Sequence, residues 1–124
     1  MTEDELLFFS EFPASIPMYQ ALKDRLEAAY PDLRVKQSKT QISFYNRRMF
    51  AMASPPWRRV KGWPANYLLA SFSLPYRKES PRVAQAVEPY PNRWTHHVLL
   101  LTPEDVDQEL LAWLDEAYRF AAAK

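Results

Sequence analysis

Near the start of the chain, apolar residues recur at the three-to-four-residue spacing of a helix that buries one face. They run from Ile16 to Tyr30, and Ser15 stands where an N-cap is expected. Pro17 falls in the first turn, where the missing N–H of proline costs no hydrogen bond. Pro31 ends the pattern, because a residue that precedes proline is driven out of the helical conformation. The spacing therefore predicts a helix over residues 16–30.

A second and clearer helical pattern lies near the end of the chain. Thr102 and Pro103 form its start signal, and an apolar stripe follows from Val106 to Ala121. Glu104 adds negative charge at the end of the helix where the backbone dipole is positive. We therefore expect a helix over residues 103–121. Both predicted helices carry acidic residues on their outer faces.

Between the helices the apolar period changes to two, which is typical of strands with one buried face. Residues 40–45, 48–53 and 67–74 alternate in this way, and residues 94–101 end in an apolar run typical of a covered strand. A short strand over residues 57–60 would make five. This order predicts an α+β fold of two layers, in which an antiparallel sheet of four to five strands packs both terminal helices on one face.

Two segments show no clear period. Residues 1–14 precede the first helical pattern and are expected to form a loose N-terminal arm. Residues 75–93 contain prolines at positions 75, 81, 89 and 91, and are expected to form a long, stiff, proline-rich loop. No repeat or linker divides the chain, so we expect residues 1–124 to form a single domain.

Composition narrows the chemistry that the chain can perform. The 124 residues include one glycine and no cysteine. A single glycine cannot build a glycine-rich phosphate loop, and without cysteine there is no disulfide or thiolate metal site. Neighbouring His96 and His97 point to opposite faces of a strand and cannot chelate one metal, so we expect no metal and no cofactor. An acidic start and the lack of a long apolar run favour a cytoplasmic protein outside the membrane.

Charge is distributed unevenly along a chain whose net charge is only +1. Residues 34–93 carry twelve bases against two acids, whereas residues 1–33 and 94–124 are net acidic. Most aromatic residues of the predicted strand region lie within this basic segment or directly after it. Arginines beside aromatic rings on an open sheet are typical of surfaces that hold single-stranded nucleic acid. The alternative is that the rings serve the core and the bases pair with the acidic helices.

Several segments together resemble a known family. They are Lys39–Ala51, Ser80–Val83, Trp94–Val98 and Thr102–Leu110, followed by Trp113 and Ala117–Tyr118. The ordered set is similar to an uncharacterised bacterial group, domain-of-unknown-function family 5655, and the resemblance covers residues 18–120. In outline that family is similar to small α+β domains of the YdhG and MmcQ kind, which implies the fold described above. The resemblance implies no activity and no catalytic residue.

The candidate ligand-binding residues lie on the polar face of the sheet and in the basic segment. Alternation brings Ser71 and Ser73 to that face with one of the two histidines, and it leaves open which one. The imidazole on that face could act as a general base or ligand donor, and the other would lie in the core. The full candidate set is Tyr45, Arg47, Arg48, Arg58, Arg59, Lys61, Ser71, Ser73, Arg82, Arg93, His96 and His97.

Three functions remain open at this point. The leading hypothesis is a non-enzymatic binding module whose basic, aromatic sheet face holds an anionic small molecule or a nucleic acid. The second is a small enzyme with a site of histidine, arginine and tyrosine under the loop 75–93. The third is a structural homodimer module without a ligand. The lack of a nucleophile motif, and of closely placed acids in the basic segment, favours binding over catalysis.

Overall fold

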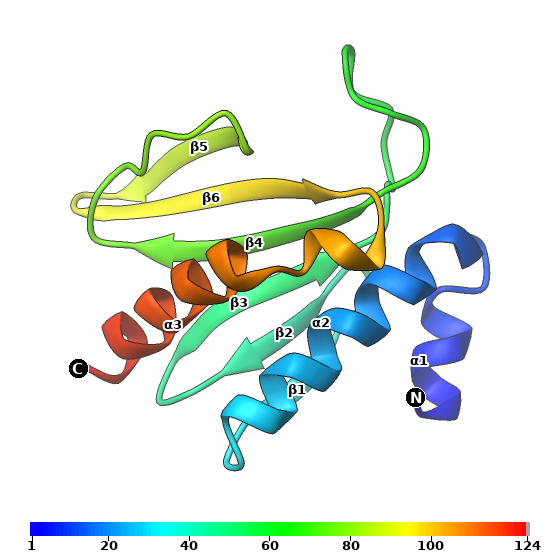
Figure 1. Ribbon diagram of the computed structural model, residues 1–124, viewed down its shortest axis with the longest axis horizontal. Coiled ribbons are helices and arrows are strands. Elements are labelled where there is room, and N and C mark those ends of the chain that lie inside the picture. The colour runs from blue at the N-terminus through cyan, green and yellow to red at the C-terminus, as the bar shows by residue number, and fades with distance from the viewer. Residues whose placement is uncertain (124) are drawn as a thin grey trace.

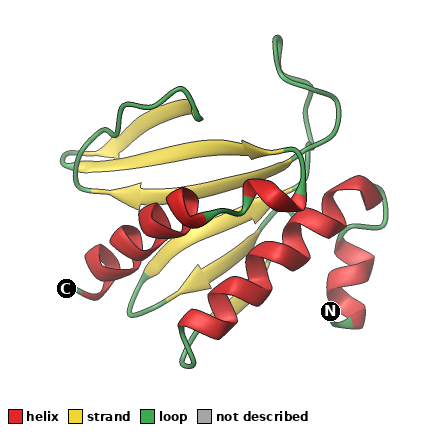
Figure 2. Ribbon diagram, in the orientation of Figure 1, coloured by secondary structure: helices red, strands yellow, loops and turns green. Residues whose placement is uncertain are grey.

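In the computed structural model, which describes residues 1–123, the helices α2 and α3 lie across one face of a six-stranded antiparallel sheet, and the short helix α1 lies to the side, next to α2 (Figures 1 and 2). The strand order is β1-β2-β3-β4-β6-β5, so only the last two strands depart from chain order. The elements are α1 (Glu3–Phe8), the 3-10 helix η1 (Pro13–Ser15), α2 (Ile16–Ala29), β1 (Arg34–Gln37), β2 (Ile42–Tyr45), β3 (Met49–Ser54), β4 (Leu68–Leu74), β5 (Val83–Tyr90), β6 (Arg93–Leu100), the 3-10 helix η2 (Pro103–Asp105) and α3 (Gln108–Ala122). The predicted α+β class is confirmed, with six strands in place of four to five.

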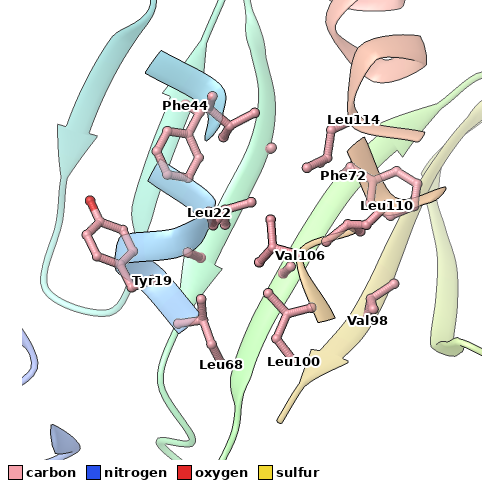
Figure 3. Packing of buried hydrophobic residues seen from close by; sticks show 14 of the residues in the cluster. Tyr19, Leu22, Phe44, Leu68, Phe72, Val98, Leu100, Val106, Leu110 and Leu114 are labelled. Atoms are coloured by element: carbon pink, nitrogen blue, oxygen red, sulfur yellow. The ribbon is translucent and has the colours of Figure 1, made fainter. Parts of the chain in front are cut away.

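The hydrophobic core lies between the sheet and the helices α2 and α3 (Figure 3). Tyr19 and Leu22 of α2 and Leu110 and Leu114 of α3 are buried there together with Phe72 of β4. Each large apolar side chain buried in this way contributes about 1.5–3 kcal/mol to folding before the entropy cost is counted. The three-to-four-residue spacing seen in the sequence therefore marks the two helix faces that cover the sheet.

Alternation along the strands separates a helix-covered face from a polar one. Phe44, Ala51 and Phe72 stand opposite one another in β2, β3 and β4 and are buried under the helices. On the other face one row runs in register across all six strands: Lys36, Ser43, Met52, Ser71, His97 and Gln85. The predicted polar face therefore exists, and His97 is the histidine that belongs to it.

The two strands that the period does not predict are the edge strands. All four residues of β1 are exposed, and so are most residues of β5. An edge strand without a buried face shows no alternation, so its sequence carries no periodic signal. The segment 75–93, expected to be a long loop, contains β5 and its hairpin to β6. The hairpin turn places Asn92 at φ 62°, a left-handed conformation that asparagine tolerates better than most residues.

Three further expectations are corrected by the structure. Residues 57–60 form no strand but belong to a loop over 55–67 that leaves the sheet between β3 and β4. The expected loose arm over 1–14 contains α1, and its Phe9 is fully buried. The last helix does not begin at residue 103. Thr102 caps only the turn η2, because Val106 leaves the helical conformation, and Asp107 then caps α3.

Candidate functional site

The candidate site is a cavity of about 260 Å³ between the polar face of the sheet and the loop 55–67. It lies where β3 ends and β4 begins. The sheet supplies one wall with His97, Leu69 and Gln85, and the loop supplies the other. The residues around it are Thr40, Gln41, Ser54, Pro55, Trp57, Arg58, Val60, Trp63, Tyr67, Leu69, Gln85 and His97.

Aromatic residues hold the loop in position at this cavity. The indole Nε1 of Trp57 donates a hydrogen bond to the backbone oxygen of Thr40, 2.7 Å away, and Phe12 meets the Trp57 ring edge-to-face with centroids 4.9 Å apart. Trp63 meets the buried Tyr67 edge-to-face at 5.7 Å. Such aromatic contacts contribute about 0.5–1.5 kcal/mol each. The loop is therefore anchored at both of its ends, to the β1–β2 turn and N-terminal segment and to the start of β4.

His97 is held in a fixed orientation in the sheet wall of the cavity. Its Nδ1 lies 2.7 Å from Ser71 Oγ, its neighbour in the polar row. Burial lowers the pKa of His97 below 6.5, and the neighbouring His96 adds to this effect. The ring is therefore neutral at neutral pH. Because Nδ1 is engaged by Ser71, Nε2 is the nitrogen left to contact a molecule in the cavity.

His96 has a different role, on the opposite face of the same strand. Its ring is fully buried and stacks on Phe72 with centroids 5.0 Å apart. Its Nε2 accepts a hydrogen bond from the backbone N–H of Lys78, so the ring hydrogen is on Nδ1. Burial lowers the pKa of His96, and the nearby Lys78 charge adds to this effect. This residue fastens the β4–β5 connection to the core and is remote from the cavity.

Arg58 is the base at the cavity. Its guanidinium is near enough to Tyr67 to lower the pKa of that phenol, although burial outweighs this effect and raises the pKa overall. Arg59 and Lys61 extend from the same loop into solvent. Within residues 1–123, none of these three bases forms an ion pair with a carboxylate. The loop therefore presents three unneutralised positive charges beside the aromatic residues.

Other predicted bases are instead bound to the acidic helix α3. Arg82 Nη1 lies 2.8 Å from Asp107 Oδ1 and 3.0 Å from Glu109 Oε1. Arg48 directs its guanidinium at the last backbone oxygens of α3, those of Phe120 and Ala121, at 3.4 Å. A positive charge is favourable there because the C-terminal end of the helix dipole is negative. Part of the basic segment therefore neutralises the helices of the same molecule.

The remaining candidates do not line the cavity. The Arg34 guanidinium lies 5.7 Å from the centroid of the Tyr45 ring, beside the β1 edge, and Arg47 is exposed in the β2–β3 turn. Ser73 and Arg93 flank a narrow crevice at the end of α3. Of the twelve predicted residues, the structure brings Arg58 and His97 together at the cavity, with Ser71 behind His97 and Arg59 and Lys61 beside it.

Several cavity residues were not among the predicted candidates, namely Trp57, Trp63, Tyr67, Gln41 and Gln85. The two tryptophans stand in a proline-flanked stretch that forms no strand, so no buried strand face requires them. The prediction of a strand over residues 57–60 concealed this signal for Trp57. Gln41 does carry a signal, because alternation along the predicted strand 40–45 places it on the polar face. Gln85 carries none, because it lies on the edge strand β5.

The structure thus defines an α+β domain whose helices cover one face of an antiparallel sheet, with an aromatic, basic cavity on the other. Residues 8–121 match the family described as Domain of unknown function (DUF5655), and the chain belongs to this family. Comparison with curated proteins and with solved structures gives no match. Among the residues described, no helix has the length and apolar character needed to span a membrane.

Proposed function

We propose that this protein is a non-enzymatic binding module for an anionic ligand with a planar ring, a nucleotide that is either free or part of a single-stranded nucleic acid. The supporting observation is that Trp57, Trp63, Arg58 and His97 converge on one cavity. Aromatic side chains stack on planar bases, and a guanidinium pairs with phosphate oxygens. A neutral imidazole at Nε2 adds a hydrogen bond to the edge of a base or to a sugar hydroxyl.

The size of the cavity limits what it can hold. At about 260 Å³ it is slightly smaller than the roughly 300–1,000 Å³ typical of sites for drug-sized ligands. It therefore suits one ring system, with an attached phosphate at the rim beside Arg58. Arg59 and Lys61 are exposed on the same loop and do not line the cavity, so they are available to the neighbouring phosphates of a single strand.

The surroundings of His97 favour binding over proton transfer. None of the residues that line the described cavity carries a carboxylate that could orient the imidazole or stabilise its charged form. Its Nδ1 faces a serine hydroxyl, and burial lowers its pKa. The loop 55–67 forms the wall of the cavity opposite the sheet, and the segment 75–93 contributes only Gln85 of β5, so the enzyme hypothesis loses the covering loop on which it relied.

A fluorescence titration tests this proposal. The protein is titrated with adenosine monophosphate and with a short single-stranded DNA, and the emission of its four tryptophans is followed, of which Trp57 and Trp63 line the cavity. We expect both ligands to quench the emission, with the DNA affinity falling more steeply as salt is added. The Arg58→Ala variant should bind adenosine monophosphate about tenfold more weakly, equivalent to about 1.4 kcal/mol.

Arg59→Ala is the matched control, because Arg59 is on the same loop but does not line the cavity. It should leave the affinity for adenosine monophosphate unchanged and weaken DNA binding only. Equal losses of affinity for adenosine monophosphate in Arg58→Ala and Arg59→Ala would mean that the loop attracts anions without using the cavity. If neither ligand binds at low salt, the proposed function is wrong.

A further inference from the structure

β5 is an edge strand whose sequence reads almost identically in both directions. The residues from Pro81 to Pro89 are Pro-Arg-Val-Ala-Gln-Ala-Val-Glu-Pro, with Gln85 at the centre. Arginine and glutamate, of opposite charge, occupy matching positions on the two sides. An antiparallel strand pair that follows a two-fold axis places each residue opposite its mirror position in the sequence. A sequence of this form is therefore complementary to a second copy of itself.

The two edges of the sheet differ in how they are protected. Edge strands in proteins that remain single commonly carry charged residues, which oppose pairing with another chain. β1 has this protection, because Arg34 and Lys36 occupy two of its four positions. The centre of β5, from Val83 to Val87, carries no charge at all. Val87 is 41% exposed, and contact of its apolar side chain with water is unfavourable.

We infer that two copies of this protein associate through β5, paired antiparallel about a two-fold axis at Gln85. Ala84 would then lie opposite Ala86 of the second copy. Val83 would lie opposite Val87 of the second copy at each end of the paired segment. A bulge between Val83 and Gln85 and another between Val87 and Tyr90 confine regular pairing to this short centre. Proline at 81 and 89 supplies no N–H for a longer ladder.

The connection from β4 to β5 leaves this edge accessible. It is held over the helix-covered face, where Lys78 N–H contacts His96 and Arg82 contacts Asp107 of α3. Ala84, Gln85 and Val87 remain exposed beside it. The axis would bring no like charges together, because Arg82 and Glu88 occupy matching positions. The pairing is therefore compatible with both the backbone and the charges around it.

Pairing through β5 would join two six-stranded sheets into one sheet of twelve strands. A two-fold axis that relates antiparallel strands stands perpendicular to the sheet, so both polar faces would lie on the same side. Gln85 also lines the cavity described above. The two cavities would therefore flank the axis on one continuous surface. The inference itself rests on the edge strand and not on the proposed ligand.

The absence of cysteine from the sequence allows a specific test. In the Gln85→Cys variant the two sulfurs would meet at the axis, because directly opposed residues have Cα atoms about 4.5–5.5 Å apart, within the range of a disulfide. We expect mild oxidation to convert this variant to a covalent dimer. The matched control is Val35→Cys, an exposed position on the other edge strand, which should form no covalent dimer.

Sedimentation of the unmodified protein supplies the second measurement. We expect a dimer at about 100 µM, and we expect Val87→Lys to weaken the association at least tenfold, whereas Val87→Thr should weaken it much less. A monomeric mass for the unmodified protein at that concentration would overturn the inference. So would equal cross-linking of the Gln85→Cys and Val35→Cys variants. Neither result depends on whether a nucleotide binds, so this inference and the proposed function can fail separately.

Discussion

Glu5 provides the most quantitative test of how the N-terminal helix is attached. Its side chain is buried, and its carboxylate accepts hydrogen bonds from Tyr19 Oη at 2.5 Å, Lys23 Nζ at 2.6 Å and the Thr2 backbone N–H at 2.9 Å. Burial alone would raise the pKa of Glu5. The hydrogen bonds from Lys23, Tyr19 and Thr2 outweigh it and lower the pKa from 4.5 to about 2. Folding therefore favours the ionised carboxylate.

The size of the effect follows from this difference in pKa. At about 1.4 kcal/mol per pKa unit, the ionised Glu5 contributes at most about 3 kcal/mol to the free energy of unfolding. A depressed pKa means that this contribution is complete above pH 4.5 and is lost as the pH falls toward 2. About 2 kcal/mol of it should already be lost at about pH 3.

The perturbation is Glu5→Gln, which keeps the shape of the side chain and removes its charge. Urea unfolding at neutral pH should show a loss of about 2 kcal/mol, because charge-assisted hydrogen bonds become neutral ones. Near pH 3 the variant and the unmodified protein should differ much less. Glu3→Gln is the control, an exposed glutamate in the first turn of the same helix. A stabilising role for the ionised Glu5 carboxylate is refuted if both variants lose the same free energy of unfolding, or if the loss in Glu5→Gln does not shrink in acid.

Two further predictions concern α3 and the histidines. Arg82→Ala should lower the free energy of unfolding by about 1 kcal/mol, since it removes the ion pairs to Asp107 and Glu109. The control is Lys36→Ala, at an exposed residue that forms no ion pair within residues 1–123, and it should change the free energy little. Equal urea midpoints for the two variants would contradict this. NMR titration should give pKa values below 6.5 for both His96 and His97, so their contribution to stability is complete above pH 6.5 and declines below it. A histidine that titrates at or above 6.5 would contradict the assigned burial.

The parts of the fold that the sequence predicts are those in which burial imposes a period. Leu22 and Leu26 in α2, and Phe72 and Leu74 in β4, recur at the spacing of their element because each must reach the same core. The edge strands β1 and β5 are exposed and escape that constraint. Their residues show no period, so the number of strands cannot be deduced from alternation alone.

The cavity and the distribution of free charge both depend on contacts between residues that are distant in sequence. At the cavity, Trp57 is bound to Thr40, 17 residues away. Outside the cavity, Arg82 is bound to Asp107, 25 residues away. The sequence shows that bases are numerous, but only the structure shows that Arg82 pairs with carboxylates at α3 and that Arg58 has no such partner within residues 1–123. His96 and His97 illustrate the same point, because they are neighbours on one strand, yet His96 is buried on the helix-covered face and His97 lines the cavity on the other face.

Nucleotide binding in the cavity is tested most directly by the indole N–H signals of the four tryptophans in an NMR titration with adenosine monophosphate. Trp57 and Trp63 line the cavity, whereas Trp94 and Trp113 do not. If the nucleotide binds in the cavity, the signals of Trp57 and Trp63 shift and saturate together while those of Trp94 and Trp113 remain unchanged. Binding in the cavity is contradicted if all four signals stay unchanged, or if only Trp94 and Trp113 respond.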